Sequence, residues 1–389
     1  MAQLTPLQDQ KDDLAFTTVI YDHQAFVMQR WGGISRYFAE LAKNVAACPG
    51  MRPLVMAPWA NNEYLTRMLG IKSRSISAHY RHRGVGELMA LESKFDRRAL
   101  GRLFARYQNA VYHPTYYDPF LLKDGLENPV VITIHDMIYE LFSGKLSGSG
   151  VVRQKREMIE RADHIVTVSQ STFDDLVRFY PKAAQKSSVI YHGVSFAPYS
   201  SRGRAFVEGD YLLFVGSRSA YKNFAGLAQA FAESAVNHLT LKLVCVGGGR
   251  FSKKEQSLLE ERGIAQRVIH KEASDEQLKN LYHFAKAFVF PSLYEGFGLP
   301  ILEAMSCGAP CVLSDIPVFH EVAADAACYC DARSSYDMAQ TIDDVLEDAE
   351  RRGRLRAAGY ERVGEFSWAR CAREHAALYR RLDKAYAAR

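Results

Sequence analysis

The stretch FVFPSLYEGFGLPILEAMSCGAPC, at Phe288–Cys311, organises the rest of the chain. The short apolar run Ala287–Phe290 is bounded by a proline, and it predicts a buried parallel strand. After a glycine-containing loop, Pro300 predicts the start of a helix, because proline is tolerated in the first helical turn. Gly308 suits a left-handed cap that ends this helix, and Cys311–Ser314 begins the next strand. The stretch therefore predicts a strand, a glycine loop, a helix N-terminus and a second strand.

The loop and the helix start form a candidate anion site. Backbone N–H groups near Gly298 and Leu299 would lie at the positive end of the helix, and Gly296 would let a ligand approach the backbone closely. Two carboxylates, Glu295 and Glu303, flank this site. Carboxylates repel phosphate, so hydroxyl groups of a ribose and of a sugar ring are their more plausible ligands. A nucleotide-sugar site fits this spacing, and a solvated loop glutamate with a dipole-favouring helix glutamate fits it equally well.

A family resemblance separates these two interpretations. The segment YEGFGLPILEAMSCGAPCVLSD resembles the signature of retaining glycosyltransferases of family 4, with its Glu-x7-Glu motif at Glu295 and Glu303. The resemblance implies an α/β chain with the GT-B fold, in which two Rossmann-like, doubly wound domains face each other across a cleft. It also implies catalysis by Glu295 and donor binding by Gly296, Phe297, Gly298, Leu299 and Glu303.

Composition is that of an ordinary globular protein. The 389 residues suit two domains, and the net charge of +5 permits anionic ligands without requiring nucleic acid, so we expect no nucleic-acid partner. The first residues carry acids and lack a long apolar core, so we expect no signal peptide, and no run is long enough for a membrane span. Seven scattered cysteines, most of them in apolar runs, favour reduced thiols in a cytoplasmic protein.

The N-terminal part predicts a doubly wound domain. Thr17–Tyr21 is a β-branched run that predicts the first strand, and Pro53–Ala57 predicts the second. Gly32 and Gly33 lie between the first strand and the first helix, where such folds hold phosphates, although a glycine pair also suits a tight turn. The stretch resembles the Tyr-Gly-Gly-Ile-Ser-Arg-Tyr segment of bacterial family members, with Trp31 in place of tyrosine. The resemblance implies that both glycines approach the donor phosphate from the opposite domain.

A histidine follows another predicted strand of this domain. Val130–Ile134 is apolar, and His135 and Asp136 come directly after it, at the edge where open α/β sheets place ligands. A single histidine at a strand end is more often structural than functional. The segment VITIHDMIYELF, however, resembles the His-Asp segment of family 4 enzymes that use nucleotide-mannose. That resemblance implies that His135 contacts the donor sugar and takes part in catalysis.

The segment His79–Tyr107 predicts a basic amphipathic helix. The apolar stripe that we predict consists of Leu88, Leu91, Phe95, Ala99 and Leu103. The basic residues Lys94, Arg98, Arg102 and Arg106 recur beside it at every fourth position. A helix of this kind can lie on an anionic membrane, which is our hypothesis of peripheral contact with the inner face of the cell membrane. The alternative is a helix packed on the core with a solvated basic face.

The C-terminal part predicts the nucleotide-sugar-binding domain. The strand Tyr211–Val215 ends at a glycine, and Arg218 and Lys222 follow, where two cations suit a diphosphate. A solvated basic loop is the alternative, but the spacing resembles the phosphate-binding pair of the family. The segment that holds the nucleobase in the family has Lys271-Glu272 here in place of its usual glycine, which leaves the base open. We place the domains at 1–200 and 201–368, with 369–389 as a helix that crosses back to the first.

The resemblance implies a retaining glycosyltransferase. We expect it to transfer a hexose to a lipid-linked saccharide acceptor, and we expect the donor to be GDP-mannose. The product would be a bacterial surface polysaccharide such as lipopolysaccharide. The chain has no Asp-x-Asp pair, so we expect no metal cofactor. Arg218 and Lys222 would stabilise the leaving diphosphate, and with His135 and Glu295 they complete the predicted catalytic set. The alternatives are a UDP-sugar-dependent transferase of the same fold, a nucleotide-sugar epimerase, and a non-catalytic subunit.

Overall fold

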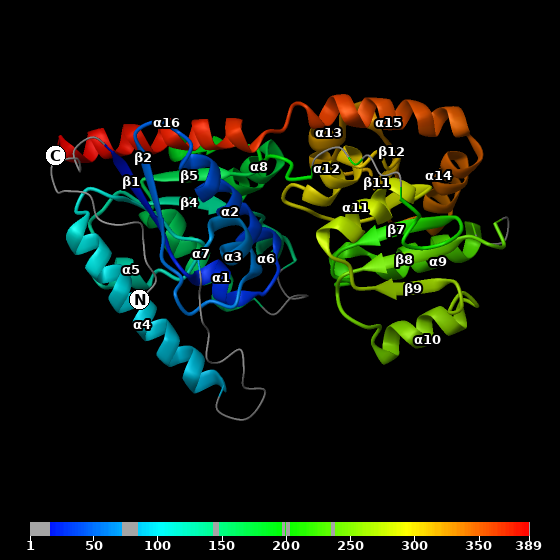
Figure 1. Cartoon of the computed structure of the whole chain (residues 1–389), viewed down its shortest axis with the longest axis horizontal. Helices are drawn as coiled ribbons and strands as arrows, with labels where there is room; N and C mark the ends of the chain where they lie inside the picture. The colour runs from blue at the N-terminus through cyan, green and yellow to red at the C-terminus, as the bar shows by residue number, and fades with distance from the viewer. Residues whose placement is uncertain are drawn as a thin grey trace. The chain divides into compact units, whose positions relative to one another are not determined.

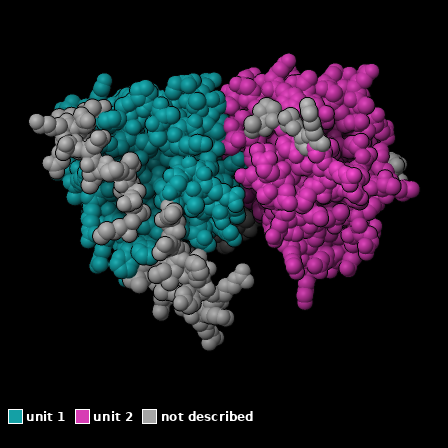
Figure 2. Space-filling view, viewed as in Figure 1, with its two compact units in different colours: residues 1–193, 367–389 teal, residues 194–366 magenta. Residues whose placement is uncertain are grey.

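The computed structural model describes residues 16–71, 85–142, 148–196, 199, 203–234 and 238–388, and of 85–93 it describes the backbone alone. The chain forms two compact units (Figures 1 and 2). Unit 1 consists of Met1–Gly193 and Ser367–Arg389, and unit 2 consists of Val194–Phe366. Unit 1 is therefore discontinuous in sequence, whereas unit 2 is one uninterrupted segment.

Unit 1 is built on parallel strands. Its two three-stranded sheets have the orders β2-β1-β3 and β4-β5-β6, and a parallel bridge between Tyr112 and Val130 links β3 to the start of β4. The strands are β1 (Thr17–Tyr21), β2 (Met51–Val55), β3 (Val111–His113), β4 (Val131–Ile134), β5 (His164–Thr167) and β6 (Ser187–Val189). The helices are α1 (Gln24–Met28), α2 (Gly33–Val45), α3 (Glu63–Leu69), α4 (Val85–Arg106), α5 (Phe120–Lys123), α6 (Ile138–Leu141), α7 (Ser149–Arg161), α8 (Gln170–Phe179), the 3-10 turn η3 (Pro181–Lys186) and α16 (Trp368–Ala387).

The predicted second strand is shifted by two residues. We expected Pro53–Ala57, but β2 spans Met51–Val55, because Met51 pairs with Thr17 at the start of the β1 ladder. Pro53 lies inside β2, opposite Val19. It is tolerated there because β2 is the edge strand of its sheet, where a missing N–H need not break the ladder.

The apolar face of α4 is also displaced from the prediction. Leu103 of the predicted stripe packs against the core, but the fully buried residues are Leu100 and Phe104. Phe95 is 46% exposed and stays on the surface. The side chains of the other two predicted stripe residues in the first half of the helix, Leu88 and Leu91, lie outside the described residues. Arg97 fixes the helix to the domain, through an ion pair of 3.0 Å with Asp118. The buried face therefore starts one position later along the helix than periodicity suggested.

Helix α16, red in Figure 1, packs in unit 1 against α2 and β1. Its buried face carries polar side chains that reach the sheet. The Tyr379 hydroxyl lies 2.7 Å from His113 Nδ1 and 3.1 Å from the Tyr21 hydroxyl. His375 Nε2 lies 3.0 Å from the Tyr37 hydroxyl of α2. These contacts make the last helix a part of the core of unit 1.

Unit 2 has one parallel six-stranded sheet of order β12-β11-β10-β7-β8-β9. The strands are β7 (Tyr211–Val215), β8 (Lys242–Val246), β9 (Val268–Lys271), β10 (Ala287–Phe290), β11 (Cys311–Ser314) and β12 (Ala327–Cys330). The helices are α9 (Phe224–Ser234), α10 (Lys253–Glu261), α11 (Asp275–Phe284), α12 (Leu299–Ser306), α13 (Pro317–Ala323), α14 (Ser335–Glu347) and α15 (Ala349–Val363), with 3-10 turns η4 (Ala220–Lys222) and η5 (Ala324–Ala326).

Both faces of this sheet are covered. On β10, Val289 belongs to the apolar cluster that α9 and α14 complete on one face. On the other face, the Phe288 ring lies 5.3 Å from Tyr282 of α11, and the Phe290 ring lies 5.4 Å from Phe319 of α13. Burial on both sides explains why the strand is a continuous apolar run rather than an alternating one. The expected doubly wound α/β arrangement is confirmed for this unit.

Candidate functional site

The N-terminus of α12 has the geometry that the sequence predicted. Gly298 precedes the helix with φ 102° and ψ 48°, a left-handed conformation that favours glycine. A Cβ at this position would also lie 3.0 Å from Ile301 Cδ1 and 3.3 Å from Phe319 Cε1. Glycine has no side chain to cap the helix, so the first-turn backbone can face a ligand. The C-terminal ends of β7, β8 and β10 point to the same edge of the parallel sheet, where this helix begins.

Lys222 and Glu295 form an ion pair at this edge. Lys222 Nζ lies 2.5 Å from Glu295 Oε1, and the two side chains are only 13% and 12% exposed. The backbone holds the two segments together, because Leu293 N donates to Tyr221 O over 2.7 Å. The structure thus brings together two of the predicted catalytic residues, which are 73 positions apart. A solvated loop glutamate is excluded as the interpretation of Glu295.

Glu303 lies inside α12 and is 7% exposed. The Tyr282 hydroxyl, from α11, is 3.5 Å from Glu303 Oε2. The alternative of an exposed helix glutamate that merely favours the helix dipole is therefore excluded. A buried carboxylate on the helix that borders the glycine loop fits a hydrogen-bonding role toward hydroxyl groups, which remains a prediction.

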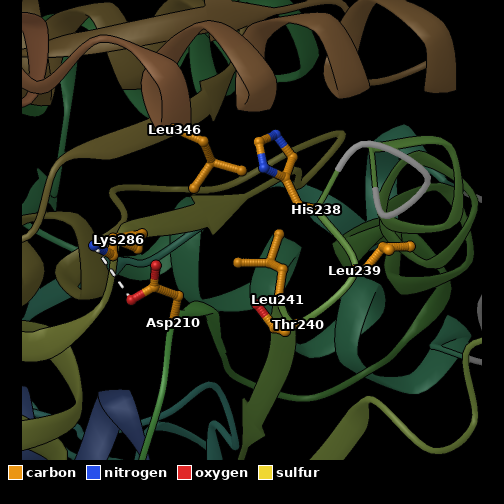
Figure 3. A pocket seen from close by; sticks show the side chains of 7 residues that line it. All are labelled: Asp210, His238, Leu239, Thr240, Leu241, Lys286 and Leu346. Atoms are coloured by element: carbon orange, nitrogen blue, oxygen red, sulfur yellow. Dashed lines mark ion pairs between the residues drawn. The ribbon is translucent and has the colours of Figure 1, made fainter.

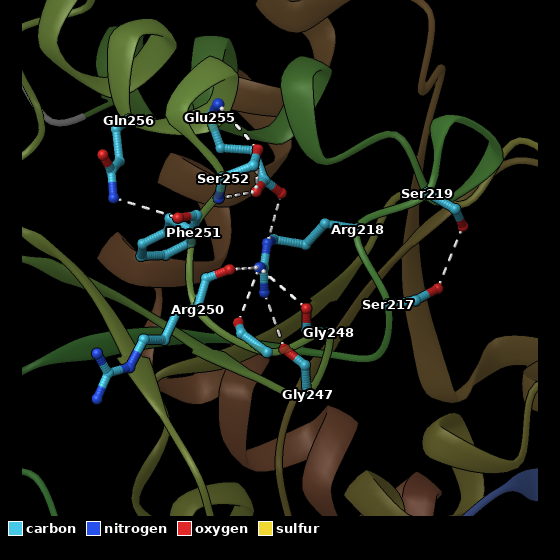
Figure 4. Close-up of polar contacts among 11 residues, drawn as sticks. Ser217, Arg218, Ser219, Gly247, Gly248, Arg250, Phe251, Ser252, Glu255 and Gln256 are labelled. Carbon is cyan, nitrogen blue, oxygen red and sulfur yellow. Dashed lines mark hydrogen bonds and ion pairs between the residues drawn. The ribbon is translucent and has the colours of Figure 1, made fainter. Parts of the chain in front are cut away.

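Arg218 is held by hydrogen bonds to the loop after β8 and to Glu255 (Figure 4). Its side chain is 3% exposed, and its Nε donates to Glu255 Oε1 over 2.6 Å. Its Nη1 donates to Gly247 O over 2.8 Å, and its Nη2 donates to Gly249 O over 2.8 Å. The guanidinium is thus directed at the loop after β8, whereas Lys222 is directed at the loop after β10. The solvated basic loop that the sequence left open is excluded for Arg218 by its burial.

His135 is the predicted catalytic residue of unit 1. His135 follows β4, and its backbone N donates to the Tyr117 hydroxyl over 3.2 Å. Its ring meets Tyr37 edge-on at 5.1 Å and stacks on His192 at 6.4 Å. Burial, with a contribution from the Lys155 cation, lowers the pKa of His135 to about 3. Nε2 of His135 is buried and has no hydrogen-bond partner among the described residues. A neutral imidazole at this place can hydrogen-bond a ligand but carries no charge at neutral pH.

The glycine pair lies at the start of α2. Gly32 has an extended φ of −171° and caps the helix, and a Cβ on it would lie 1.8 Å from Gln29 Oε1. Gly33 is the first helical residue, and a Cβ on it would meet nothing within 4 Å. A side chain at the first position would displace the exposed Gln29 side chain, whereas the second position offers open space beside the backbone. A role of either glycine toward a phosphate stays a prediction.

Sequence reasoning missed two charged residues that support the predicted ones. Glu255 binds Arg218, and the signal that could have found it is the capping box that it forms with Ser252 at the start of α10. Lys155 of α7 donates to Asp136 O and to Glu140 Oε2, each over 2.9 Å, and so holds the segment that carries His135. No local pattern indicates that a lysine in the middle of a basic helix is buried.

A cavity of about 350 Å³ lies at the opposite edge of the unit 2 sheet (Figure 3). Asp210, Leu241 and Lys286 line it, and they directly precede β7, β8 and β10. Because these strands are parallel, the cavity is at their N-terminal ends, away from Lys222 and Glu295. It is therefore not a part of the candidate site.

The described residues show neither a candidate metal site nor a candidate membrane span. In that part of the chain, no group of three or more His, Cys, Asp or Glu side chains could hold a metal ion. None of the described helices is both long and apolar enough to cross a membrane. The expectation of metal-independent activity stays a prediction.

Comparison with known proteins decides the family. A model of glycosyltransferase family 4 matches residues 31–197, and a model of group 1 glycosyl transferases matches residues 200–362. The chain belongs to glycosyltransferase family 4. The O-antigen chain mannosyltransferase B of Escherichia coli is 28% identical to this glycosyltransferase over 377 residues, 90% of this chain and 96% of that protein. The O-antigen chain mannosyltransferase RfbU of Salmonella typhimurium is 31% identical over 238 residues, 59% of this chain and 65% of that protein.

A solved structure shows the same fold. The sucrose-phosphate synthase of Thermosynechococcus elongatus superimposes with a TM-score of 0.76 at 20% sequence identity. The match covers 95% of this glycosyltransferase and 100% of that chain. The GT-B fold expected from the glycine loop and its flanking strands is thereby confirmed.

Proposed function

We propose that this glycosyltransferase moves mannose from GDP-mannose to a lipid-linked saccharide, with retention of the anomeric configuration, in the synthesis of a bacterial surface polysaccharide. The Lys222–Glu295 ion pair beside the glycine loop carries the proposal, because it combines a cation for a diphosphate with a carboxylate for sugar hydroxyls. The names of two relatives, both O-antigen mannosyltransferases, support mannose as the sugar.

The proposed chemistry needs charge stabilisation rather than a protein nucleophile. The acceptor hydroxyl oxygen forms the new bond to the anomeric carbon on the face that the diphosphate leaves. The electrons of the broken C–O bond go to the diphosphate, and a phosphate oxygen takes the acceptor proton. Lys222 stabilises the growing negative charge, and Glu295 orients Lys222 while its second oxygen accepts from a sugar hydroxyl. Neutral His135 would hydrogen-bond the sugar.

The first experiment identifies the donor. A thermal-shift panel compares GDP, UDP, ADP and their sugars, because the nucleotide that binds the folded protein raises its Tm by mass action. We expect a rise with GDP and GDP-mannose. A rise in Tm with UDP and UDP-sugars instead would identify a UDP-sugar as the donor, and the proposed reaction would remain glycosyl transfer. Anomeric NMR of the product then tests retention, and conversion of the donor sugar without an acceptor would indicate an epimerase.

Metal-independent turnover is part of the same proposal. In place of a metal ion, Lys222 would supply positive charge beside the diphosphate. Activity should therefore survive EDTA. If chelation abolished turnover and magnesium or manganese restored it, this part of the proposal would be wrong.

Peripheral membrane contact is the last part of the proposal. The four predicted basic residues of α4, Lys94, Arg98, Arg102 and Arg106, are exposed. Phe95 is exposed among them and could enter a lipid headgroup layer. This surface would bring the enzyme to a lipid-linked acceptor.

A further inference from the structure

The Arg218 guanidinium is held by five protein acceptors. One of them lies at Nε, one at Nη1 and three at Nη2. These acceptors are Glu255 Oε1 and the carbonyl oxygens of Gly247, Gly248, Gly249 and Arg250, at 2.6–3.3 Å. The rings of Phe224 and Phe251 also lie within 5.8 Å and 4.8 Å of its Cζ. These contacts fix the orientation of the side chain relative to the loop after β8.

The turn after β8 is shaped around this guanidinium. Gly247, Gly248 and Gly249 have φ of 89°, 69° and 72°, so three successive residues are left-handed. A Cβ on Gly248 would lie 2.9 Å from Arg218 Nη1, and one on Gly247 would lie 3.1 Å from Gly216 O. Only glycine combines this conformation with such close approach. Arg218 thus replaces the hydrogen bonds that the turn cannot make within itself.

The peptide planes of the turn set the direction of its N–H groups. In a trans peptide, the C=O and the following N–H point in opposite directions. Because the carbonyls of Gly247, Gly248 and Gly249 face Arg218, the next three N–H groups face away from it. Gly248, Gly249 and Arg250, which own these N–H groups, are exposed. The orientation of this exposed backbone at the ligand edge of the sheet depends on where Arg218 is held.

Glu255 holds Arg218 in place. Its Oε1 accepts from Arg218 Nε, and its Oε2 accepts from the backbone N and the hydroxyl of Ser252, each over 2.7 Å. Burial opposes ionisation of Glu255, but hydrogen bonds from Arg218 and Ser252 outweigh it and hold its pKa below the usual value. The carboxylate therefore stays charged at neutral pH, and its charge offsets that of Arg218. The pair therefore presents little net charge to a ligand. Its effect on the site comes from the position in which it holds the loop after β8.

We propose that Glu255 is a positioning residue for donor binding, which acts through Arg218 on the turn Gly247–Arg250. Arg218 then acts on the donor site through the shape of this turn, beside the cation of Lys222. The inference rests on the proposed function, because the ligand whose binding it affects is the nucleotide-sugar donor.

The test compares Glu255→Gln with two controls. Glutamine keeps one oxygen for Ser252 but turns an N–H toward Arg218 Nε, so it weakens the clamp. We expect the KM for GDP-mannose to rise about tenfold with kcat within about threefold, because ground-state binding is affected more than the chemical step. Glu260→Gln changes an exposed carboxylate of the same helix, and Ser334→Ala removes the side-chain cap of α14, a helix that does not carry Glu255. Neither control should raise the donor KM, although Ser334→Ala should lower the Tm.

A double-mutant comparison separates positioning from general destabilisation. If Glu255 acts through Arg218, the effects of Glu255→Gln and Arg218→Lys on the donor KM should be far from additive. A wild-type KM in Glu255→Gln, or a KM rise of equal size in Ser334→Ala, would overturn the inference while the wild type still turns over GDP-mannose. Failure of the wild type to bind any nucleotide would instead overturn the proposed function, and this inference with it.

Discussion

At the scale of single residues, substitution of Lys222 is the most direct test of the proposed mechanism. Its Nζ is the cation next to the glycine loop, and negative charge on the diphosphate grows as the glycosidic bond breaks. Removing an electrostatic stabiliser of that kind typically costs about 10²–10³ in kcat. Lys222→Ala should therefore lower kcat by about this factor in steady-state assays.

A matched variant controls for the loss of a positive charge. Lys254→Ala removes an exposed lysine of α10, and its kcat should stay near that of the wild type. Circular dichroism and Tm must show that Lys222→Ala folds, since the variant leaves Glu295 without its cation. Near-normal kcat in a folded Lys222→Ala would mean that another group stabilises the leaving diphosphate.

Glu303 should behave differently. We assign its buried carboxylate to the nucleotide ribose, a contact that is equal in the ground and transition states. Glu303→Ala should therefore raise the donor KM and retain more turnover than Lys222→Ala at saturating donor. The measurement is the split between KM and kcat on the same protein preparations. A fall in kcat as deep as that of Lys222→Ala would contradict the ribose assignment.

The sequence predicted some of these side chains better than others. The pairing of Lys222 with Glu295 agrees with two motifs that both follow strands of one parallel sheet, and strand ends of this kind meet at one edge. The orientation of Arg218 could not be predicted. Its partners are 29 to 37 residues away, and a nearby loop with three glycines gave no indication that its carbonyls converge on a guanidinium.

At the scale of elements, the strands were the most predictable part. β1, β7, β10 and β11 begin and end where their apolar runs meet prolines, glycines or polar residues. The buried face of a helix was harder to predict, as α4 shows. Leu100 and Phe104 form its buried face, and this choice depends on which neighbours the helix meets, here the loop that carries Asp118. Periodicity sets the angle between residues but not the absolute direction of the face.

The basic surface of α4 gives a prediction about membranes. Each basic residue near an anionic leaflet contributes about 1 kcal/mol, screened by salt. The protein should therefore co-sediment with vesicles rich in anionic lipid at low salt and be released at high salt. Reversal of the charges of Lys94, Arg98, Arg102 and Arg106 should abolish this sedimentation.

The control reverses the same number of charges on unit 2. The exposed residues for it are Lys253, Lys254, Arg262 and Arg333. Sedimentation of this control should fall much less than that of the α4 variant. Equal loss in both would assign the effect to net charge, and no loss in the α4 variant would identify α4 as a solvated face.

At the scale of the whole molecule, buried histidines couple the stability of unit 1 to pH. Burial lowers the pKa of His375 to about 4 and that of His135 to about 3, and it lowers the pKa of His113 and His192 well below the ordinary value. The unfolded chain, with histidine pKa values near 6.5, therefore binds more protons than the folded chain between about pH 6.5 and pH 4.

The sign of the effect follows from this difference. The neutral buried histidines do not lower the free energy of unfolding above about pH 6.5. As pH falls from there toward 4, the free energy of unfolding decreases by up to about 1.4 kcal/mol per pH unit for each histidine. Urea unfolding at pH 8, 6.5 and 5 should show a falling free energy of unfolding. His375→Gln should reduce this slope, because it removes one of the groups that titrate only on unfolding. A slope unchanged by His375→Gln would show that His375 is not protonated on unfolding in this range.

The discontinuity of unit 1 has a consequence for synthesis on the ribosome. Trp368, Cys371, Ala372, Ala376 and Tyr379 of α16 belong to the apolar core of unit 1, yet they are translated after all of unit 2. At about 5–20 residues per second, the first 193 residues wait on the order of tens of seconds with an open apolar face, a period in which a holdase chaperone could bind them. Unit 2 comes second in the chain, but it is the first that the nascent protein can complete.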